Sequence, residues 1–207
     1  MRLPYAPSDP PKDDPPTAEI YAAIAARRKP RPLIPLDLTL LHSPPVASGW
    51  SSFIGALRTQ TALSRSRPDL VELAISRIAV LNRAVHEWNV HALLAVKAGV
   101  SEEGLETVRT QTDTITGVAE DGEGGLSGEQ WAVLAYTDAM TRNVKVEDRV
   151  FEGVRSALGG EERAVVELTA TVAGYNAVSR FLVALDVGEL NGGEIRSVRQ
   201  LRKEGGH

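Results

Sequence analysis

Histidine and glutamate gather in one short stretch, which reads His86-Glu87-Trp88-Asn89-Val90-His91. Glu87 and His91 stand four residues apart, so on a helix their side chains project from nearly the same face. A carboxylate there can orient the imidazole, fix its tautomer or share a proton with it, and imidazole titrates near neutral pH. The pair is therefore a candidate acid/base unit.

The same residues argue against two other kinds of chemistry. His86 and His91 are five apart and diverge by ~140° on a helix, so the HExxH pattern of zinc proteases is missing. Glu87 and His91 alone remain a possible metal pair, but we expect no metal site. The chain has no cysteine, which excludes thiolate nucleophiles, disulfides and thiolate metal sites.

Each candidate residue also has a purely structural interpretation. A Glu-x-x-x-His pair is usually a surface pair that adds only a few tenths of a kcal/mol. Trp88 fits a core or an interface, and Arg77 fits an ion pair. Glu72 would be solvated on a polar helix face, and His42, before Ser-Pro-Pro, would only cap a turn. Spacing alone does not reach a function.

Helices must position these residues. A long segment begins near Pro68, after capping-box spacing between Ser66 and Asp69, and ends at Gly99. We expect a break near Asn82, which can cap a second helix. Glu72 then lies on the first helix of the pair, and residues 86–91 lie on the second.

Further helices are expected on both sides of this pair. Their expected spans are 17–29 with Thr17 as N-cap, 36–41, 46–63, a short one from 101, 127–142 with a capping box, 150–158 and 161–186. Residues 110–125 are polar and glycine-rich and should form a mobile loop. No segment alternates with a period of two, so the fold should be all-α.

The domain organisation follows from composition along the chain. Residues 1–16 are rich in proline and charge, and we expect an N-terminal arm that is solvated or extended over the surface. Residues 17–188 should form one helical domain, and residues 189–207 a polar, frayed tail.

Charge and hydropathy limit the partners. A formal charge of −4 gives no basic footprint, so nucleic acid is not an expected partner. No run approaches the ~20 apolar residues of a membrane span, and the first residues do not have the apolar core of a signal peptide. We therefore expect a cytoplasmic protein without a membrane partner.

The sequence resembles the carboxymuconolactone decarboxylase and alkylhydroperoxidase-D-like superfamily. The resemblance rests on Glu72-Leu73-Ala74-Ile75 followed by residues 81–91, and it extends over about residues 36 to 185. His42-Ser43-Pro44 before Trp50, and Tyr175-Asn176 with Arg180, are similar to flanking features of longer members. The resemblance implies a helical bundle of the alkylhydroperoxidase-D-like type, with an N-terminal helical extension, and a homo-oligomer, either a dimer or a trimer-based assembly.

The positions of the family motif select a branch. In the peroxidase branch a glutamate is followed by two cysteines and a histidine, and here these positions hold Glu72, Ala84, Glu87 and His91. Thiol-dependent peroxide reduction is excluded because both thiols are missing. The decarboxylase branch commonly carries Tyr-Glu-Trp-x-x-His, and His86 stands at its tyrosine position.

This resemblance implies a cofactor-free decarboxylase that acts on a small carbonyl-containing organic acid or lactone. His91 would return a proton to the enolate, Glu87 would orient His91, and Glu72 would position the imidazole or a water. Oxyanion or carboxylate charge would be stabilised by His86 or Arg77, and Trp88 and His42 would complete the substrate site. An isomerase, cyclase or dehydratase on the same residues, and a non-catalytic scaffold, remain alternatives.

Overall fold

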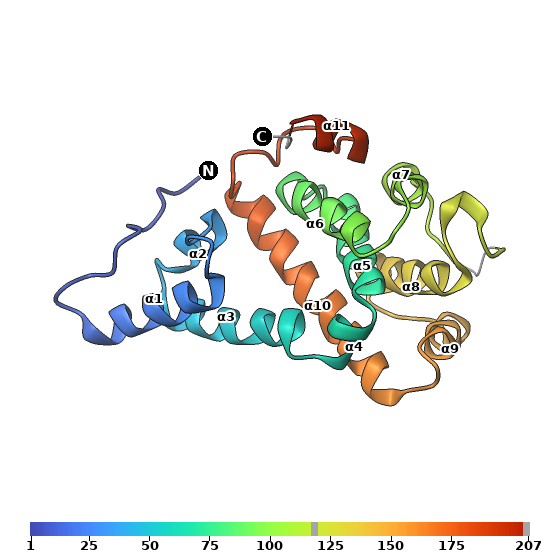
Figure 1. The fold of residues 1–207 in the computed structure, drawn as a ribbon, viewed down its shortest axis with the longest axis horizontal. Coiled ribbons are helices and arrows are strands. Elements are labelled where there is room, and N and C mark those ends of the chain that lie inside the picture. Colours follow the sequence, from blue (N-terminus) through green and yellow to red (C-terminus); the bar gives the residue numbers. More distant parts are fainter. Residues whose placement is uncertain (117–119, 205–207) are drawn as a thin grey trace.

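The computed structural model describes residues 1–116 and 120–204, and within these ranges the chain forms helices and no strand, which confirms the all-α prediction (Figure 1). The centre of the expected 110–125 loop and the last three residues of the expected tail lie outside the described residues. The helices are α1 Pro15–Arg28, α2 Pro35–Leu40, α3 Pro44–Thr59, α4 Ala62–Ser66, α5 Pro68–Leu81, α6 Val85–Lys97, α7 Glu102–Thr110, α8 Gly128–Asp138, α9 Asp148–Ala157, α10 Glu162–Leu185 and α11 Val198–Glu204.

The expected break in the central helical segment separates α5 from α6. Asn82 ends α5 instead of starting α6, because its side chain donates to Asn176 Oδ1 and Ser179 Oγ on α10 rather than to a helix end. Ala84 occupies the N-cap of α6. Gly99, with φ of +104°, follows the end of α6 as expected.

Several helix ends agree with the sequence and others do not. Ser101 caps α7, and Ser127 forms the expected capping box with Gln130 at α8. At α1 the N-cap is Asp14, whose carboxylate accepts from the Thr17 amide, so Thr17 is inside the helix. The expected capping box at α5 is absent, because the Ser66 hydroxyl donates to the Ala62 carbonyl. The single helix expected over 46–63 divides into α3 and α4.

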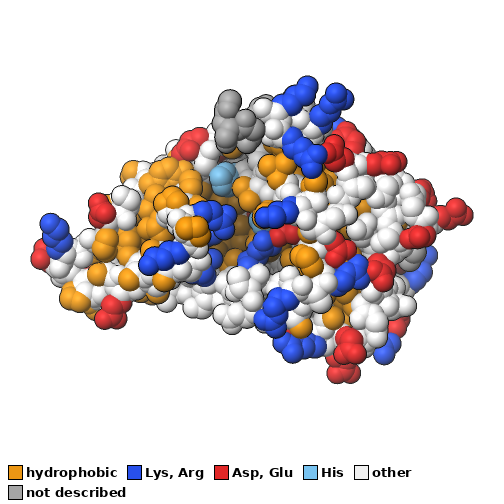
Figure 2. Space-filling view, viewed as in Figure 1, with side chains coloured by type: hydrophobic (Ala, Val, Ile, Leu, Met, Phe, Trp, Pro, Cys, Tyr) orange, Lys and Arg blue, Asp and Glu red, His pale blue; other side chains and the backbone are white. Residues whose placement is uncertain are grey.

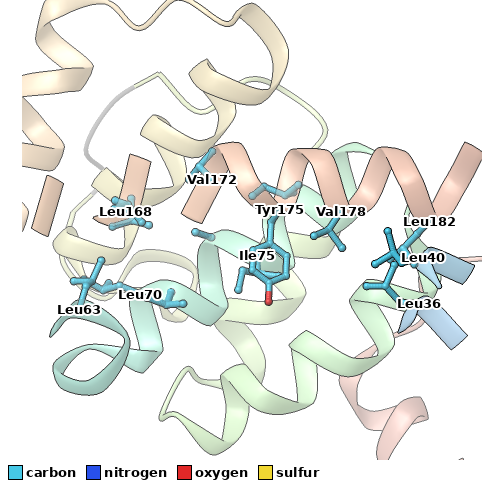
Figure 3. Packing of buried hydrophobic residues seen from close by; sticks show 14 of the residues in the cluster. Leu36, Leu40, Leu63, Leu70, Ile75, Leu168, Val172, Tyr175, Val178 and Leu182 are labelled. Atoms are coloured by element: carbon cyan, nitrogen blue, oxygen red, sulfur yellow. The ribbon is translucent and has the colours of Figure 1, made fainter. Parts of the chain in front are cut away.

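The core is centred on α10 and α5. Apolar side chains of the two helices belong to one buried cluster, which includes Leu70 and Ile75 from α5 and Leu168 and Val172 from α10 (Figure 3). By length and mean hydropathy α10 alone is comparable to a membrane-spanning helix among the described residues. Its packing against α5 accounts for that hydropathy, as expected for a core helix.

The N-terminal helices pack on the other side of α10 from α5 and α6 (Figure 1). α1 and α2 both contact α3, and α3 contacts α10. Leu36 and Leu40 of α2 lie close to Leu182 (Figure 3). The segment before α1 is partly packed rather than solvated: Ala6 is buried, and its amide donates to the Leu38 carbonyl.

The C-terminal segment is also packed, where a frayed tail was expected. α11 contacts α6 and α7, and its Val198 and Leu201 are buried. The two residues stand three apart and face the same side of the helix. Two apolar residues in a short, mostly polar segment are too few to indicate a helix from the sequence. This packing fixes the far side of α6, the helix that carries His91.

Candidate active site

A cavity of about 280 Å³ lies between α6, α10, α3 and the α1–α2 segment. Its apolar wall consists of Ile34, Pro35, Leu36, Ile54, Val90, Leu94, Val178 and Leu182. Its polar groups are Arg27, Arg28, Arg31, Arg58, His86, Glu87, His91 and Tyr175. The space-filling view shows hydrophobic side chains around a hollow beside these helices, with arginine or lysine and histidine side chains at its edge (Figure 2).

Four helices contribute side chains to one connected set of contacts. Glu72 from α5 accepts from His91 Nδ1 of α6 at 2.7 Å, and its other oxygen lies 2.5 Å from the Arg58 guanidinium of α3. The Tyr175 ring of α10 meets the His91 imidazole edge-on, with ring centroids 5.1 Å apart. Glu72 itself does not line the cavity, so its contact with His91 Nδ1 lies outside the cavity.

The electrostatics of this chain fix the tautomer of His91. Burial alone would raise the pKa of Glu72, but hydrogen bonds and charges from His91 and Arg58 lower it below its ordinary value. Burial lowers the pKa of His91, and Glu72 offsets only part of that effect. A neutral imidazole that donates its Nδ1 proton to a carboxylate leaves the lone pair on Nε2. His91 is therefore arranged as a base.

Glu87 has the opposite character. Its side chain lines the cavity but is buried, with 2% exposure, and neither carboxyl oxygen has a hydrogen-bond partner among the described residues. Burial raises the pKa of Glu87 well above its ordinary value. Burial therefore favours the neutral carboxylic acid form of Glu87. The expected contact in which Glu87 orients His91 is not formed, because Glu72 occupies Nδ1.

His86 lines the cavity near the C-terminal end of α10. Burial is the main cause that lowers the pKa of His86, so its imidazole is also neutral. Its ring lies directly over Gly188, where a Cβ atom would overlap it. The His86 amide donates to the side chain of Asn191, which ties the start of α6 to the segment after α10.

Residues 44–121 match the family model described as "Carboxymuconolactone decarboxylase family". This match agrees with the resemblance found in the sequence. The matched span runs from the start of α3 to beyond α7 and includes Arg58, Glu72, Glu87 and His91, and its lack of cysteine agrees with the branch expected from the sequence. No curated protein significantly matches the chain.

Within the family span, Trp88 and Arg77 lie away from the cavity, contrary to the expected substrate contacts. Trp88 is fully buried, and its indole donates to the Arg196 carbonyl near α11. The Arg77 guanidinium makes a bidentate pair with Asp138 at 2.6 and 2.8 Å and donates to two carbonyls, so four of its five N–H donors are used within the protein, and Arg77 does not line the cavity. Both follow the structural interpretation given to them above.

His42, outside the family span, also does not line the cavity. Its Nε2 lies 2.6 Å from the carbonyl oxygen of Pro4, and the side chain is at the surface. His42 therefore fixes the N-terminal segment to the end of α2. The imidazole has a structural partner and no route to the acid/base pair.

The cavity also contains residues that the sequence did not identify as site residues. Arg58 was one of many arginines, and its contact with Glu72 joins two helices, which spacing within one helix does not reveal. Arg27 and Arg28 suited the end of a helix, and Arg31 followed them in a proline-rich stretch. Only Tyr175 carried a signal, since it belongs to the flanking features that resemble longer members of the family.

The described residues contain no group of three or more histidine, aspartate or glutamate side chains placed to hold a metal ion. Glu72 and His91 contact each other, and Glu87 stands apart from both as a neutral acid.

Proposed function

We propose that the protein is an acid/base enzyme that decarboxylates a small carbonyl-containing organic acid or lactone. The observation that carries the proposal is the pairing of a neutral, unpartnered Glu87 with a neutral His91 in one cavity. The two groups have their protonation states set in opposite directions, which is how a protein prepares one acid and one base at the same pH. The family assignment supports the reaction class.

In the proposed reaction Glu87 protonates the substrate carbonyl. The C–C bond to the carboxylate breaks, carbon dioxide leaves, and the electron pair moves to the carbonyl oxygen, which accepts the Glu87 proton to form an enol. His91 Nε2 then removes the enol proton while the α-carbon takes a proton from solvent. The proton on His91 returns to Glu87, so one solvent proton is consumed for each carbon dioxide released.

This assignment changes the roles expected from the sequence. Glu87, rather than His91, gives the first proton, and Glu72, rather than Glu87, orients His91. Arg58 stands beside Glu72 and the cavity and would stabilise negative charge in place of Arg77. The apolar wall would exclude water and strengthen each of these interactions.

An isomerase is the second candidate, and the same opposed protonation states favour it. His91 would take a proton from the carbon next to a carbonyl while Glu87 gives one to the oxygen, without loss of carbon. This reaction needs no carboxylate on the substrate at the reacting carbon.

The two reactions separate in heavy water. A panel of β-keto acids and unsaturated lactone acids is incubated with the protein, and carbon dioxide and deuterium incorporation are both measured. Decarboxylation releases carbon dioxide and places deuterium in the product; isomerisation gives deuterium exchange alone. Neither change with any member of the panel would count against both reactions.

Variants then test the site. Glu87→Gln and His91→Gln should each lower kcat by about 10²–10⁴. His42→Gln serves as the matched control, since that imidazole lies at the surface, and it should keep full activity. Full activity in both site variants would reject the assignment.

The expected homo-oligomer remains a prediction. Light scattering at micromolar concentrations should show a dimer or a trimer-based assembly, and a strict monomer would contradict it.

A further inference from the structure

Four arginines surround the cavity, and three of them are held by acidic side chains. Asp37 is buried and accepts from Arg28 at 2.7 and 2.8 Å, and its Oδ1 lies 3.6 Å from Arg27. Arg58 is paired with Glu72. These contacts fix the three guanidinium groups in place before any ligand enters.

Arg31 differs from the other three. It lines the same cavity, yet among the described residues its guanidinium makes no hydrogen bond or ion pair. Among the described residues that line the cavity the single acidic one is Glu87, whose burial favours the uncharged form and which stands at the acid/base end. Arg31 is therefore a cation whose five donors remain open toward the cavity and solvent.

The backbone around Arg31 is restrained. Pro30 and Pro32 flank it, and each proline ring fixes one φ angle, so the turn between α1 and α2 has few alternative shapes. Its amide donates to the Arg28 carbonyl at 3.0 Å, which ties it to the arginine held by Asp37. A restrained backbone lowers the entropy lost when a side chain closes on a ligand.

The positive charge around the cavity exceeds the negative charge. Asp37 and Glu72 offset part of the charge of the four arginines, and His86 and His91 are neutral, so an excess of positive charge remains. Charge repulsion between Arg27 and Arg28 is only partly relieved by the shared Asp37. An oxyanion in the cavity would complete this balance.

We propose that Arg31 is a specificity-determining residue that binds an oxyanion on the ligand, and that the α1–α2 segment selects ligands with a compact apolar body and such a group. The segment lies before residues 44–121, so this selection is added to the family span rather than part of it. The proposal rests on the same cavity being the ligand site, as in the proposed function. At about 280 Å³ the cavity is just below the ~300–1,000 Å³ usual for small-molecule sites, which favours a small ligand.

Three probes with one apolar body test the proposal by calorimetry. Benzoate and phenylphosphonate carry an oxyanion, and benzamide is the neutral counterpart. The wild-type protein should bind benzoate at least tenfold more tightly than benzamide. Arg31→Gln should remove that preference, and Arg31→Lys should restore it in part, because a lysine keeps the charge but loses the bidentate fork.

Arg65→Gln is the matched control, because Arg65 is exposed on α4 and does not line the cavity. It should leave all three affinities unchanged. A preference for phenylphosphonate over benzoate that depends on Arg31 would support the proposal and identify a phosphate-type group. The proposal would be overturned if Arg31→Gln preferred benzoate over benzamide as strongly as the wild type does. It would also be overturned if the wild type showed no such preference.

The probe experiment is independent of turnover. If Glu87→Gln and His91→Gln retained full activity on a substrate, the proposed acid/base roles would fail while an Arg31-dependent affinity for benzoate could still stand. Conversely, loss of the Arg31 effect would leave the acid/base chemistry untouched. Thermal unfolding of each variant controls for misfolding, and exposed Arg31 should tolerate substitution.

Discussion

Glu87 is an acidic group that lowers the stability of the fold at neutral pH. Its folded pKa is raised above the unfolded value, so the folded state binds the proton more tightly, and stability should fall as pH rises through the interval between the two values. The slope within that interval is about 1.4 kcal/mol per pH unit. Urea unfolding from pH 5 to pH 8 measures it.

Glu87→Gln should flatten this dependence, because a neutral amide of the same shape does not ionise. The variant should be more stable than wild type at pH 8 and close to it at pH 5, while losing activity. A gain in stability that accompanies a loss of activity is typical of a functional group held in an unfavourable environment. An unchanged pH profile of unfolding would show that Glu87 ionises freely.

Glu72 should control the titration of His91. Glu72 raises the pKa of His91 against the larger effect of burial, so Glu72→Gln should lower that pKa further. Nuclear magnetic resonance titration of the imidazole Cε1 proton measures the shift, and His42 provides the internal control. A pKa for His91 that does not move would contradict the contact at Nδ1.

The contact between Glu72 and His91 also illustrates which site features a sequence can predict. Glu72, Glu87 and His91 were found by type and spacing, and His86 by its place beside them. The choice between Glu72 and Glu87 as the partner of His91 was not predictable, because it depends on the crossing of α5 and α6 rather than on spacing within α6. Proximity along one helix favoured the wrong carboxylate.

At the scale of elements, the segment after α10 holds His86 through a glycine. Gly188 has φ of +84° and lies directly under the imidazole, so Gly188→Ala would add both backbone strain and a steric overlap. Gly160→Ala is the control, with φ of +74° and no atom within 4 Å of the added Cβ. Gly188→Ala should destabilise the protein by about 1–3 kcal/mol more than the control, measured by urea unfolding.

The same pair of variants reports on the site. If Gly188 supports His86, the imidazole signal of His86 should shift in Gly188→Ala and stay in place in Gly160→Ala. Equal destabilisation in the two variants would mean that His86 moves aside at no cost, and the segment after α10 would then have no part in placing it.

Helix existence was well predicted, and helix ends were predicted less well. Apolar spacing and the prolines at the first positions of α2, α3 and α5 indicated these helices, and Ser101 and Ser127 indicated two caps. The failures at Thr17, Ser66 and Asn82 share a cause. Each is a polar residue able to cap a helix, but each was committed to another hydrogen bond that only the fold or a competing neighbour decides.

For the whole molecule, the charge distribution is more informative than the net charge. The chain carries a formal charge of −4, yet four arginines line its cavity, and burial favours the neutral form of Glu87, the one acidic side chain among the described lining residues. Net charge therefore argued against a nucleic-acid partner but could not reveal that arginines gather around the cavity. The segments that were expected to be arm and tail also contribute to the fold, since Ala6 and two side chains of α11 are buried. Their polar neighbours in the sequence gave no sign of this burial.

Substitution of Arg77 tests whether the stability of the fold and ligand binding depend on different residues. It joins α5 to α8 through Asp138, and Asp138 also accepts from the Ile115 amide, so one buried pair connects two helices and the loop after α7. Arg77→Gln leaves Asp138 without its bidentate partner and should destabilise the protein by about 3–5 kcal/mol in urea unfolding. The folded fraction should bind benzoate with unchanged affinity, because Arg77 lies away from the cavity. Arg58→Gln should weaken benzoate binding, because Arg58 lines the cavity. A loss of benzoate affinity in folded Arg77→Gln would show that Arg77 does take part in ligand binding.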